Sequence, residues 1–333
     1  MSARGSEIST GVPPAAADTI VSGPRSRTTP AEIRVDPWSG DEVILAPGRL
    51  SIGATKPSGL PTPSTRCPFC PGHEADAEVT IAQIGEPWQT RTVGNRFPLV
   101  APTMEHARGV HEVIVETREH DVDLPDLDAS ALVRVLTMYR DRTRALAGID
   151  GARAVVLFRN RGRRSGSSQP HPHAQIAALP FVPPETRKRD AIASADPELL
   201  ARTLDEERRG DRVVSASSDF ITFCPYASKR SFEVRIAPTR RIERLSEVDD
   251  AGLTSLADHL GRAVRGLRAH MGLSDYNVLF RDPALATHGA FFSIDILPRT
   301  GGDAGFELHT GASICLVPPE ETAAALRGHS TPS

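Results

Sequence analysis

The chain has 333 residues, of which 39% are hydrophobic, and its 39 Lys and Arg against 42 Asp and Glu give a formal net charge of −3. This composition is typical of a globular protein with a sizeable core, and it excludes fibrous, largely disordered and strongly basic nucleic-acid-binding chains. No apolar run approaches the roughly 20 residues that span a bilayer, and residues 1–30 lack the apolar centre of a signal peptide. We therefore predict a cytoplasmic protein that has neither nucleic acid nor membrane as a partner.

The first 72 residues predict a tail, a hairpin and a loop. Residues 1–30 are rich in Ser, Thr, Pro, Ala and Gly, which predicts a disordered tail. Residues 32–49 predict two strands around the turn residues Pro37, Ser39 and Gly40. Residues 50–72 predict a loop rich in Pro and Gly.

The next elements alternate between strands and one helix. Strands are predicted over 110–117 (VHEVIVET), 152–160 (ARAVVLFRN) and 171–179 (HPHAQIAAL), the last after a loop of Gly and Ser (GRRSGSS). Apolar residues at helical spacing predict a helix from Ala129 to Leu146, capped by Asp128.

The second half repeats this order at an offset of about 121 residues. The repeat places Glu233 on Glu112 and Asp249 on Asp128, and NVLFRD (277–282) matches VVLFRN (155–160). An α+β protein built by duplication is the prediction, and a chance match of two helices that each follow a strand is the alternative. The predicted parts are a tail (1–30), an N-terminal domain (31–185), a linker (186–212), a C-terminal domain (213–328) and a short tail (329–333).

The run HPHAQ carries one candidate for chemistry. Side chains alternate along a strand, so His171, His173 and Gln175 share one face. The preceding loop has the Gly and Ser content that lets backbone N–H groups and hydroxyls approach a phosphate. An imidazole aimed at such a phosphate can act as a nucleophile. The alternative is a pair of surface histidines on an edge strand.

A C-x-x-C pair, Cys67 and Cys70, carries the second candidate. Its turn-rich loop is typical of half a zinc site, whereas a redox pair needs an apolar strand before the motif, and PSGLPTPSTR precedes it here. The remaining ligands must be histidines or carboxylates, and spacing alone does not choose among the histidines. The candidates are His73, His106, His111, His120 and His171.

Five blocks of sequence occur in a familiar order: RCPFCPGHE, VGNRFPLV, GVHEVIVETREHDVDLPDL, FRNRGRRSGSSQPHPHAQIAALPFVPP and GDAGFELHTGASICLVPPEETAAALR. In this order the chain resembles the galactose-1-phosphate uridylyltransferases and the similar ADP-glucose phosphorylases, the transferase branch of the histidine triad superfamily. The resemblance covers about residues 31–328. It implies a duplicated histidine-triad-like fold, with antiparallel sheets and packed helices.

The resemblance also implies roles for single residues. His173 matches the nucleophile that takes a nucleotidyl group, and Gln175 matches the residue that hydrogen-bonds the phosphoryl group. One zinc ion per chain is implied at Cys67, Cys70, His120 and His171. The implied substrate contacts are Arg34, Arg49, Asn95, Asn160, Ser167, Ser168 and Glu307.

The implied activity is that of a UDP-glucose–hexose-1-phosphate uridylyltransferase in galactose metabolism, with ping-pong transfer through a nucleotidyl-histidine. Its partners would be a nucleotide sugar and a sugar 1-phosphate, and a homodimer is expected because relatives often dimerise. Two alternatives stay open: a phosphorylase of ADP-sugars or other nucleotide sugars, and a noncatalytic zinc-stabilised nucleotide-binding protein. Many relatives carry imidazoles where this chain has Phe291 and Ser293, so we predict no second metal site.

Overall fold

The computed structural model describes residues 31–47, 49 and 66–328. The predicted tails, 1–30 and 329–333, lie outside these residues, as does most of the loop predicted over 50–72. Within the described part of the chain, no helix is long and apolar enough to cross a membrane.

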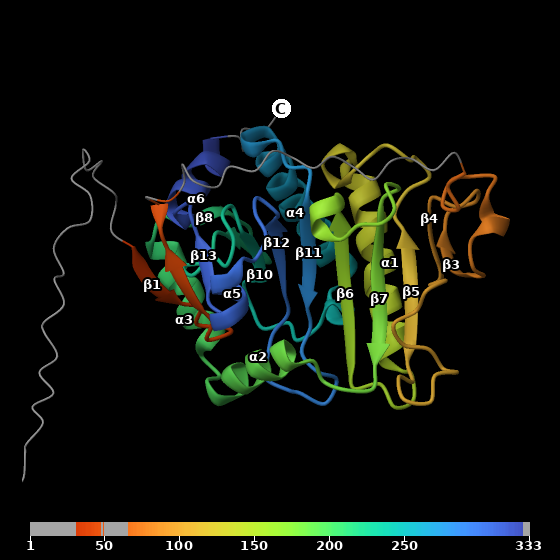
Figure 1. Ribbon diagram of the computed structural model, residues 1–333, viewed down its shortest axis with the longest axis horizontal. Helices are drawn as coiled ribbons and strands as arrows, with labels where there is room; N and C mark the ends of the chain where they lie inside the picture. Colours follow the sequence, from red (N-terminus) through yellow and green to blue (C-terminus); the bar gives the residue numbers. More distant parts are fainter. Residues whose placement is uncertain (1–30, 48, 50–65, 329–333) are drawn as a thin grey trace, which may run out of the picture.

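A ten-stranded antiparallel sheet forms the centre of the molecule (Figure 1). Its spatial order is β3 (Thr80–Ile84), β4 (Thr90–Gly94), β5 (Val110–Val115), β7 (His173–Leu179), β6 (Ala154–Arg161), β11 (Tyr276–Arg281), β12 (Ser293–Pro298), β10 (Val234–Pro238), β9 (Phe220–Phe223) and β8 (Val213–Ala216). Each half contributes five strands in mirrored order, and β6 pairs with β11 at the junction. The α+β fold class and the duplication are confirmed.

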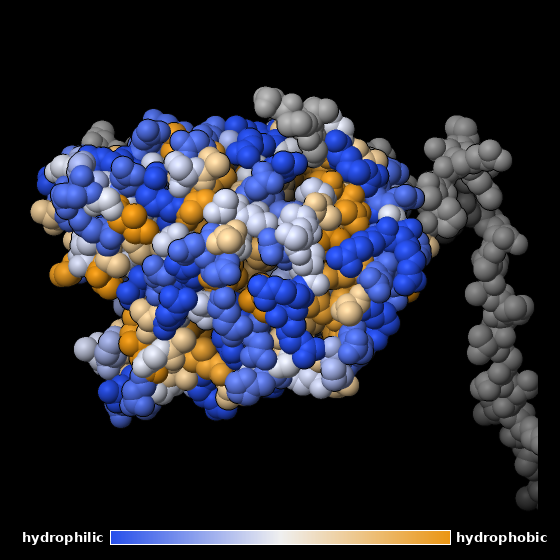
Figure 2. Space-filling view, turned by 180° about the vertical axis from the view of Figure 1, so that it is seen from behind, coloured by the Kyte–Doolittle hydropathy of each residue, from blue (hydrophilic) through white to orange (hydrophobic). Residues whose placement is uncertain are grey.

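One long helix from each half covers the same face of this sheet. These helices are α1 (Ala129–Ala147) and α4 (Asp250–Met271), and Figure 1 views the sheet from its other face. As predicted, Asp128 caps α1 by accepting a hydrogen bond from the backbone N–H of Ala131 (2.7 Å), and Asp249 does the same for α4 through Gly252 (2.7 Å). Apolar side chains from both helices and the sheet form the largest core cluster. Seen from behind, the molecule is mostly hydrophilic, with separate apolar patches (Figure 2).

The stretch predicted as a linker is structured. It forms most of α2 (Pro184–Ala195) and all of α3 (Leu199–Arg209). Leu200 and Leu204 of α3 are buried in a cluster with Trp38 and Phe223. Most of the charged residues that suggested a linker therefore lie on the solvated side of the helices, although Asp190 and Glu207 are buried, and the apolar residues pack against the second half.

A small sheet lies at the far end of the molecule from β3 and β4 (Figure 1). The predicted hairpin forms β1 (Glu32–Val35) and β2 (Glu42–Leu45), and Gly40 in its turn has a positive φ of 65°. β2 also pairs in parallel with β13 (Ser313–Cys315). In the chain, β13 follows α5 (Gly305–Thr310) and precedes α6 (Pro319–Gly328). The hairpin prediction is confirmed, whereas the edge strand β3 and its neighbour β4 are not among the predicted strands.

Candidate active site and metal centre

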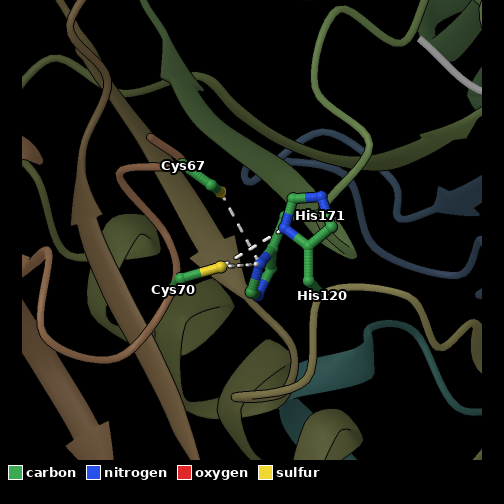
Figure 3. A group of neighbouring side chains, drawn as sticks. All are labelled: Cys67, Cys70, His120 and His171. Atoms are coloured by element: carbon green, nitrogen blue, oxygen red, sulfur yellow. Dashed lines mark hydrogen bonds between the residues drawn. The ribbon is translucent and has the colours of Figure 1, made fainter. Parts of the chain in front are cut away.

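Two thiols and two imidazoles point toward one another beside the start of β7 (Figure 3). Their ligand atoms all lie within 4.8 Å of one another. Cys70 Sγ is 3.3 Å from His120 Nδ1 and 3.6 Å from His171 Nδ1, and Cys67 Sγ is 3.8 Å from His171 Nδ1. The structure thus selects His120 and His171 from the five candidate histidines.

This donor set fits a tetrahedral metal ion. Metal–sulfur bonds of about 2.3 Å and metal–nitrogen bonds of about 2.0–2.1 Å imply sulfur–nitrogen edges of about 3.5 Å, which the distances above bracket. His171 Nε2 is 2.8 Å from the carbonyl oxygen of Thr117, so the ring donates its proton there and keeps the Nδ1 lone pair for the metal. Burial lowers the pKa of His171 to about 4, so its imidazole is neutral. The four residues could therefore bind a metal ion.

His173, the first residue of β7, lies directly after this cluster. Its ring is buried, and Nδ1 lies 2.8 Å from the carbonyl oxygen of His171. Because a carbonyl only accepts, Nδ1 carries the proton and the Nε2 lone pair is free. Burial lowers the pKa of His173, which keeps the ring neutral. Phe69, between the two cysteines, packs its ring 5.7 Å from that of His173.

Gln175 lies two residues further on the same face of β7. Its Oε1 accepts a hydrogen bond from Asn95 Nδ2 (3.4 Å) and lies 3.1 Å from His111 Nε2. His111 comes from β5, where it pairs with Ala177 and is a diagonal neighbour of Gln175. From its sequence context, His111 is predicted only as a candidate metal ligand, although the strand alternation of VHEVIV already places it with Val113 and Val115 on one face.

A buried network of charged side chains lies behind this site and links β6 to two carboxylates that follow β5 in the chain. Arg159 on β6 donates to Glu116 (2.8 Å) and to Asp123 (2.7 Å). Tyr139 of α1 and Tyr276 of β11 also donate to these two carboxylates. Burial opposes ionisation of Asp123, yet the Arg159 guanidinium holds the pKa of that carboxyl below its usual range. Because Glu116 N–H also donates to Pro172 O (3.2 Å), the network reaches the HPH run itself.

Replacing Arg159 by Met should destabilise the protein by about 3–5 kcal/mol, because it leaves buried Glu116 without its cation and leaves Asp123 with only the longer pair to Arg161 (3.4 Å). Chemical denaturation of the variant measures this free energy of unfolding. Arg262, which pairs with Asp258 on the exposed side of α4, offers the matched control. Its replacement by Met should cost under about 1 kcal/mol, and equal costs at the two sites would contradict the role assigned to Arg159.

Three of the predicted substrate contacts closely precede His173 in the chain: Asn160, Ser167 and Ser168. β6 and β7 are paired up to Arg159 and Ala174, so the same register brings Asn160 beside His173. Asn160 Oδ1 accepts a hydrogen bond from Asn277 (2.7 Å). Ser167 is buried and donates to the carbonyl of Gln169 (2.8 Å), and Ser168 is exposed.

The other proposed substrate contacts do not converge on His173 within one chain. Arg34 lies on β1, far along the molecule from β7 (Figure 1), and pairs with Glu320 (3.0 Å). Arg49 is exposed just before the stretch that the structure does not describe. Glu307 lies in α5, also away from β7 (Figure 1), and accepts the backbone N–H of Ala304 (3.0 Å).

The second half has different side chains where the first has its histidines. Ser293 begins β12 as His173 begins β7, and its hydroxyl accepts a hydrogen bond from Arg189 (2.9 Å). Phe291 is buried against Trp38, with ring centroids 4.8 Å apart. These groups pack or pair with their own neighbours.

Known proteins resemble both the sequence and the fold. The family described as galactose-1-phosphate uridyl transferase, N-terminal domain, matches residues 100–183. The chain is 27% identical over 328 residues to ADP-glucose phosphorylase of Arabidopsis thaliana, covering 89% of this chain and 92% of that protein. It is 33% identical over 248 residues to galactose-1-phosphate uridylyltransferase of Streptomyces lividans, covering 71% of this chain and 65% of that protein.

The crystal structure of an Arabidopsis thaliana ADP-glucose phosphorylase with bound ADP-glucose superposes with a TM-score of 0.78 at 25% identity. The superposition covers 90% of this chain and 98% of that one. The sequence match and the superposition with ADP-glucose phosphorylase thus each cover about nine tenths of the chain. The region that matches the family contains the HPHAQ run. In sequence and fold the chain is therefore similar to the galactose-1-phosphate uridylyltransferases and ADP-glucose phosphorylase, which are nucleotidyl-transferring enzymes.

Proposed function

We propose that this protein is a nucleotidyltransferase that takes a nucleoside monophosphate from a nucleotide sugar onto His173 and passes it to a second phosphate-bearing acceptor. UDP-glucose and a hexose 1-phosphate are the proposed pair, as in a galactose-1-phosphate uridylyltransferase. The first half contains the catalytic residues and the second half serves as scaffold. The enzyme acts in the cytoplasm as a homodimer. A noncatalytic nucleotide binder is not favoured, because both relatives described above are enzymes.

The observation that carries this proposal is the fixed tautomer of His173. With Nδ1 donating to the carbonyl of His171, the Nε2 lone pair is free to attack. Nε2 bonds to the α-phosphorus, the bond from that phosphorus to the bridging oxygen breaks, and the sugar 1-phosphate leaves with the electron pair. A phosphate oxygen of the acceptor then attacks the same phosphorus and returns the imidazole to its neutral form. Splitting one displacement into two is the logic of covalent catalysis.

Zinc is the metal we propose for the cysteine and histidine cluster, one ion per chain. Two thiolates and two neutral imidazoles form a donor set that zinc prefers in closed structural sites. Burial and the neighbouring Cys67 raise the pKa of Cys70 to about 11, so metal binding must displace its proton. When bound, the ion supplies structural cross-linking of the Cys67–Cys70 loop to the start of β7.

A phosphorylase of ADP-sugars is the second candidate, favoured by a specific observation. The match to ADP-glucose phosphorylase covers nearly the whole of both chains, whereas the match to the Streptomyces enzyme covers 65% of that protein. In this case inorganic phosphate, rather than a sugar 1-phosphate, accepts the nucleotidyl group. Both reactions share the same first step on His173.

Mass spectrometry of the intact protein tests the shared step. Incubation with UDP-glucose or ADP-glucose should add one nucleoside monophosphate per chain, and galactose 1-phosphate or inorganic phosphate should then remove it. Removal of UMP by galactose 1-phosphate supports the uridylyltransferase, and removal of AMP by phosphate supports the phosphorylase. A chain that stays unmodified with either nucleotide sugar would contradict both.

Gln175→Glu should slow adduct formation by about 10²-fold, because it places an anionic oxygen where an amide N–H would face the phosphoryl group. The replacement keeps the size of the side chain and one oxygen for Asn95 and His111. Single-turnover kinetics with the preferred nucleotide sugar measure the rate. Gln83→Glu, in an exposed position on β3, is the matched control and should leave the rate unchanged.

A further inference from the structure

A chain of hydrogen bonds leads from the backbone to Gln175. The backbone N–H of Leu99 donates to His111 Nδ1 (3.1 Å), and His111 Nε2 lies 3.1 Å from Gln175 Oε1. On the other side, Asn95 Oδ1 accepts the backbone N–H of Phe97 (2.8 Å), so the Asn95 amide group is left to donate to Gln175 Oε1 (3.4 Å). His111 itself is 6% exposed, whereas Asn95 and Gln175 are half-buried.

Only one set of proton positions satisfies these contacts. Because a backbone N–H points at His111 Nδ1, that nitrogen must be the acceptor, and in a neutral imidazole Nε2 then carries the proton. Burial lowers the pKa of His111, which favours the neutral ring. Nε2–H and the Asn95 amide are both donors, so both must use Gln175 Oε1, although His111 and Asn95 also lie 3.2 Å apart. The carbonyl end of the Gln175 amide is therefore held by two donors.

We propose that His111 is a positioning residue that fixes the orientation of the Gln175 amide, so that its NH₂ group, rather than its oxygen, faces the transferred phosphoryl group. An amide turned by 180° would place an acceptor oxygen against an anionic phosphate, and the two donors oppose that turn. Asn95 acts with His111 in this role. The inference rests on the proposed function and concerns the same site, but it assigns His111, which lies outside the metal cluster, to the transfer reaction.

A double-mutant cycle on the rate of adduct formation tests this proposal. His111→Phe fills the space but removes the donor, and we expect the rate to fall about 10–100-fold with the apparent affinity for the nucleotide sugar within about threefold of the wild type. In a Gln175→Ala background the same replacement should change the rate less than about twofold, because its target is gone. His111→Gln, which can both donate and accept, should retain the rate within about fivefold of the wild type.

The outcomes separate this proposal from the proposed function. A wild-type chain that forms no adduct overturns the proposed function and this inference with it. If the wild type forms the adduct, an equal loss of rate from His111→Phe in both backgrounds, or no loss in either, overturns this inference alone. His111→Leu is a second apolar variant, and melting temperature and zinc content are measured for both His111→Leu and His111→Phe. Loss of the fold or of zinc in both apolar variants would assign His111 a purely structural role and overturn the proposal.

Discussion

Replacing His173 by Gly should abolish nucleotidyl transfer and leave a folded protein that still binds zinc. Turnover should fall by at least about 10³-fold, because the group that forms the covalent intermediate is gone while substrate binding remains. His173 does not contribute a ligand atom to the metal cluster, so zinc content should stay near one ion per chain. Steady-state transfer and intact mass measure the loss, and added imidazole should restore part of the turnover by occupying the vacated space.

The neighbouring His171 provides the contrast. Its Nδ1 belongs to the metal cluster, so His171→Gly should lower zinc content and melting temperature as well as turnover. His288, 81% exposed in its side chain, is the control and should tolerate the same replacement without effect. Near-native turnover of His173→Gly, or equal losses of stability for the His171 and His173 variants, would overturn the catalytic assignment.

Loss of one thiolate should unfold part of the first half. Cys67→Ser should release zinc and lower the free energy of unfolding by at least about 3 kcal/mol, since metal-binding free energy is partly folding free energy. Transfer should also slow, because His171 both contributes a metal ligand and accepts the His173 Nδ1–H at its carbonyl. Elemental analysis, thermal unfolding and transfer rate are measured on one preparation.

Cys224 provides the control for this experiment. It is a fully buried thiol on the second-half side of the molecule, and burial raises its pKa well above the ordinary value. Cys224→Ala should keep one zinc ion per chain even where the core loses stability. Unchanged zinc content and melting temperature in Cys67→Ser would show that the cluster holds no structural metal.

The pattern within each segment was enough to predict the local structure around the site. Strand alternation put His173 and Gln175 on one face of β7, and Asp128 followed by apolar residues at helical spacing predicted the start of α1. These features depend on neighbours within a few residues along the chain, so one sequence contains their cause. The duplicated order of elements was visible for the same reason, because each copy repeats its own local pattern.

Contacts between distant segments needed the tertiary structure. From residue spacing alone five histidines were equal candidates for the metal, and only the folding of the 117–121 turn against the Cys67–Cys70 loop singles out His120. The helices α2 and α3 look like a charged linker in sequence, because the partners of their apolar side chains come from Trp38 and β9.

Local patterns in the sequence therefore predict the strands next to the site, the helix caps, the repeat and the two motifs, because the physical causes of these features are local. What each motif contacts depends on the tertiary structure. It joined β6 to β11 in one sheet, it set Arg159 between the Glu116 and Asp123 carboxylates, and it placed His111 of β5 against Gln175 of β7. These contacts join residues from 36 to more than 100 positions apart, and their geometry follows from sheet register and helix packing, which no short stretch of sequence contains.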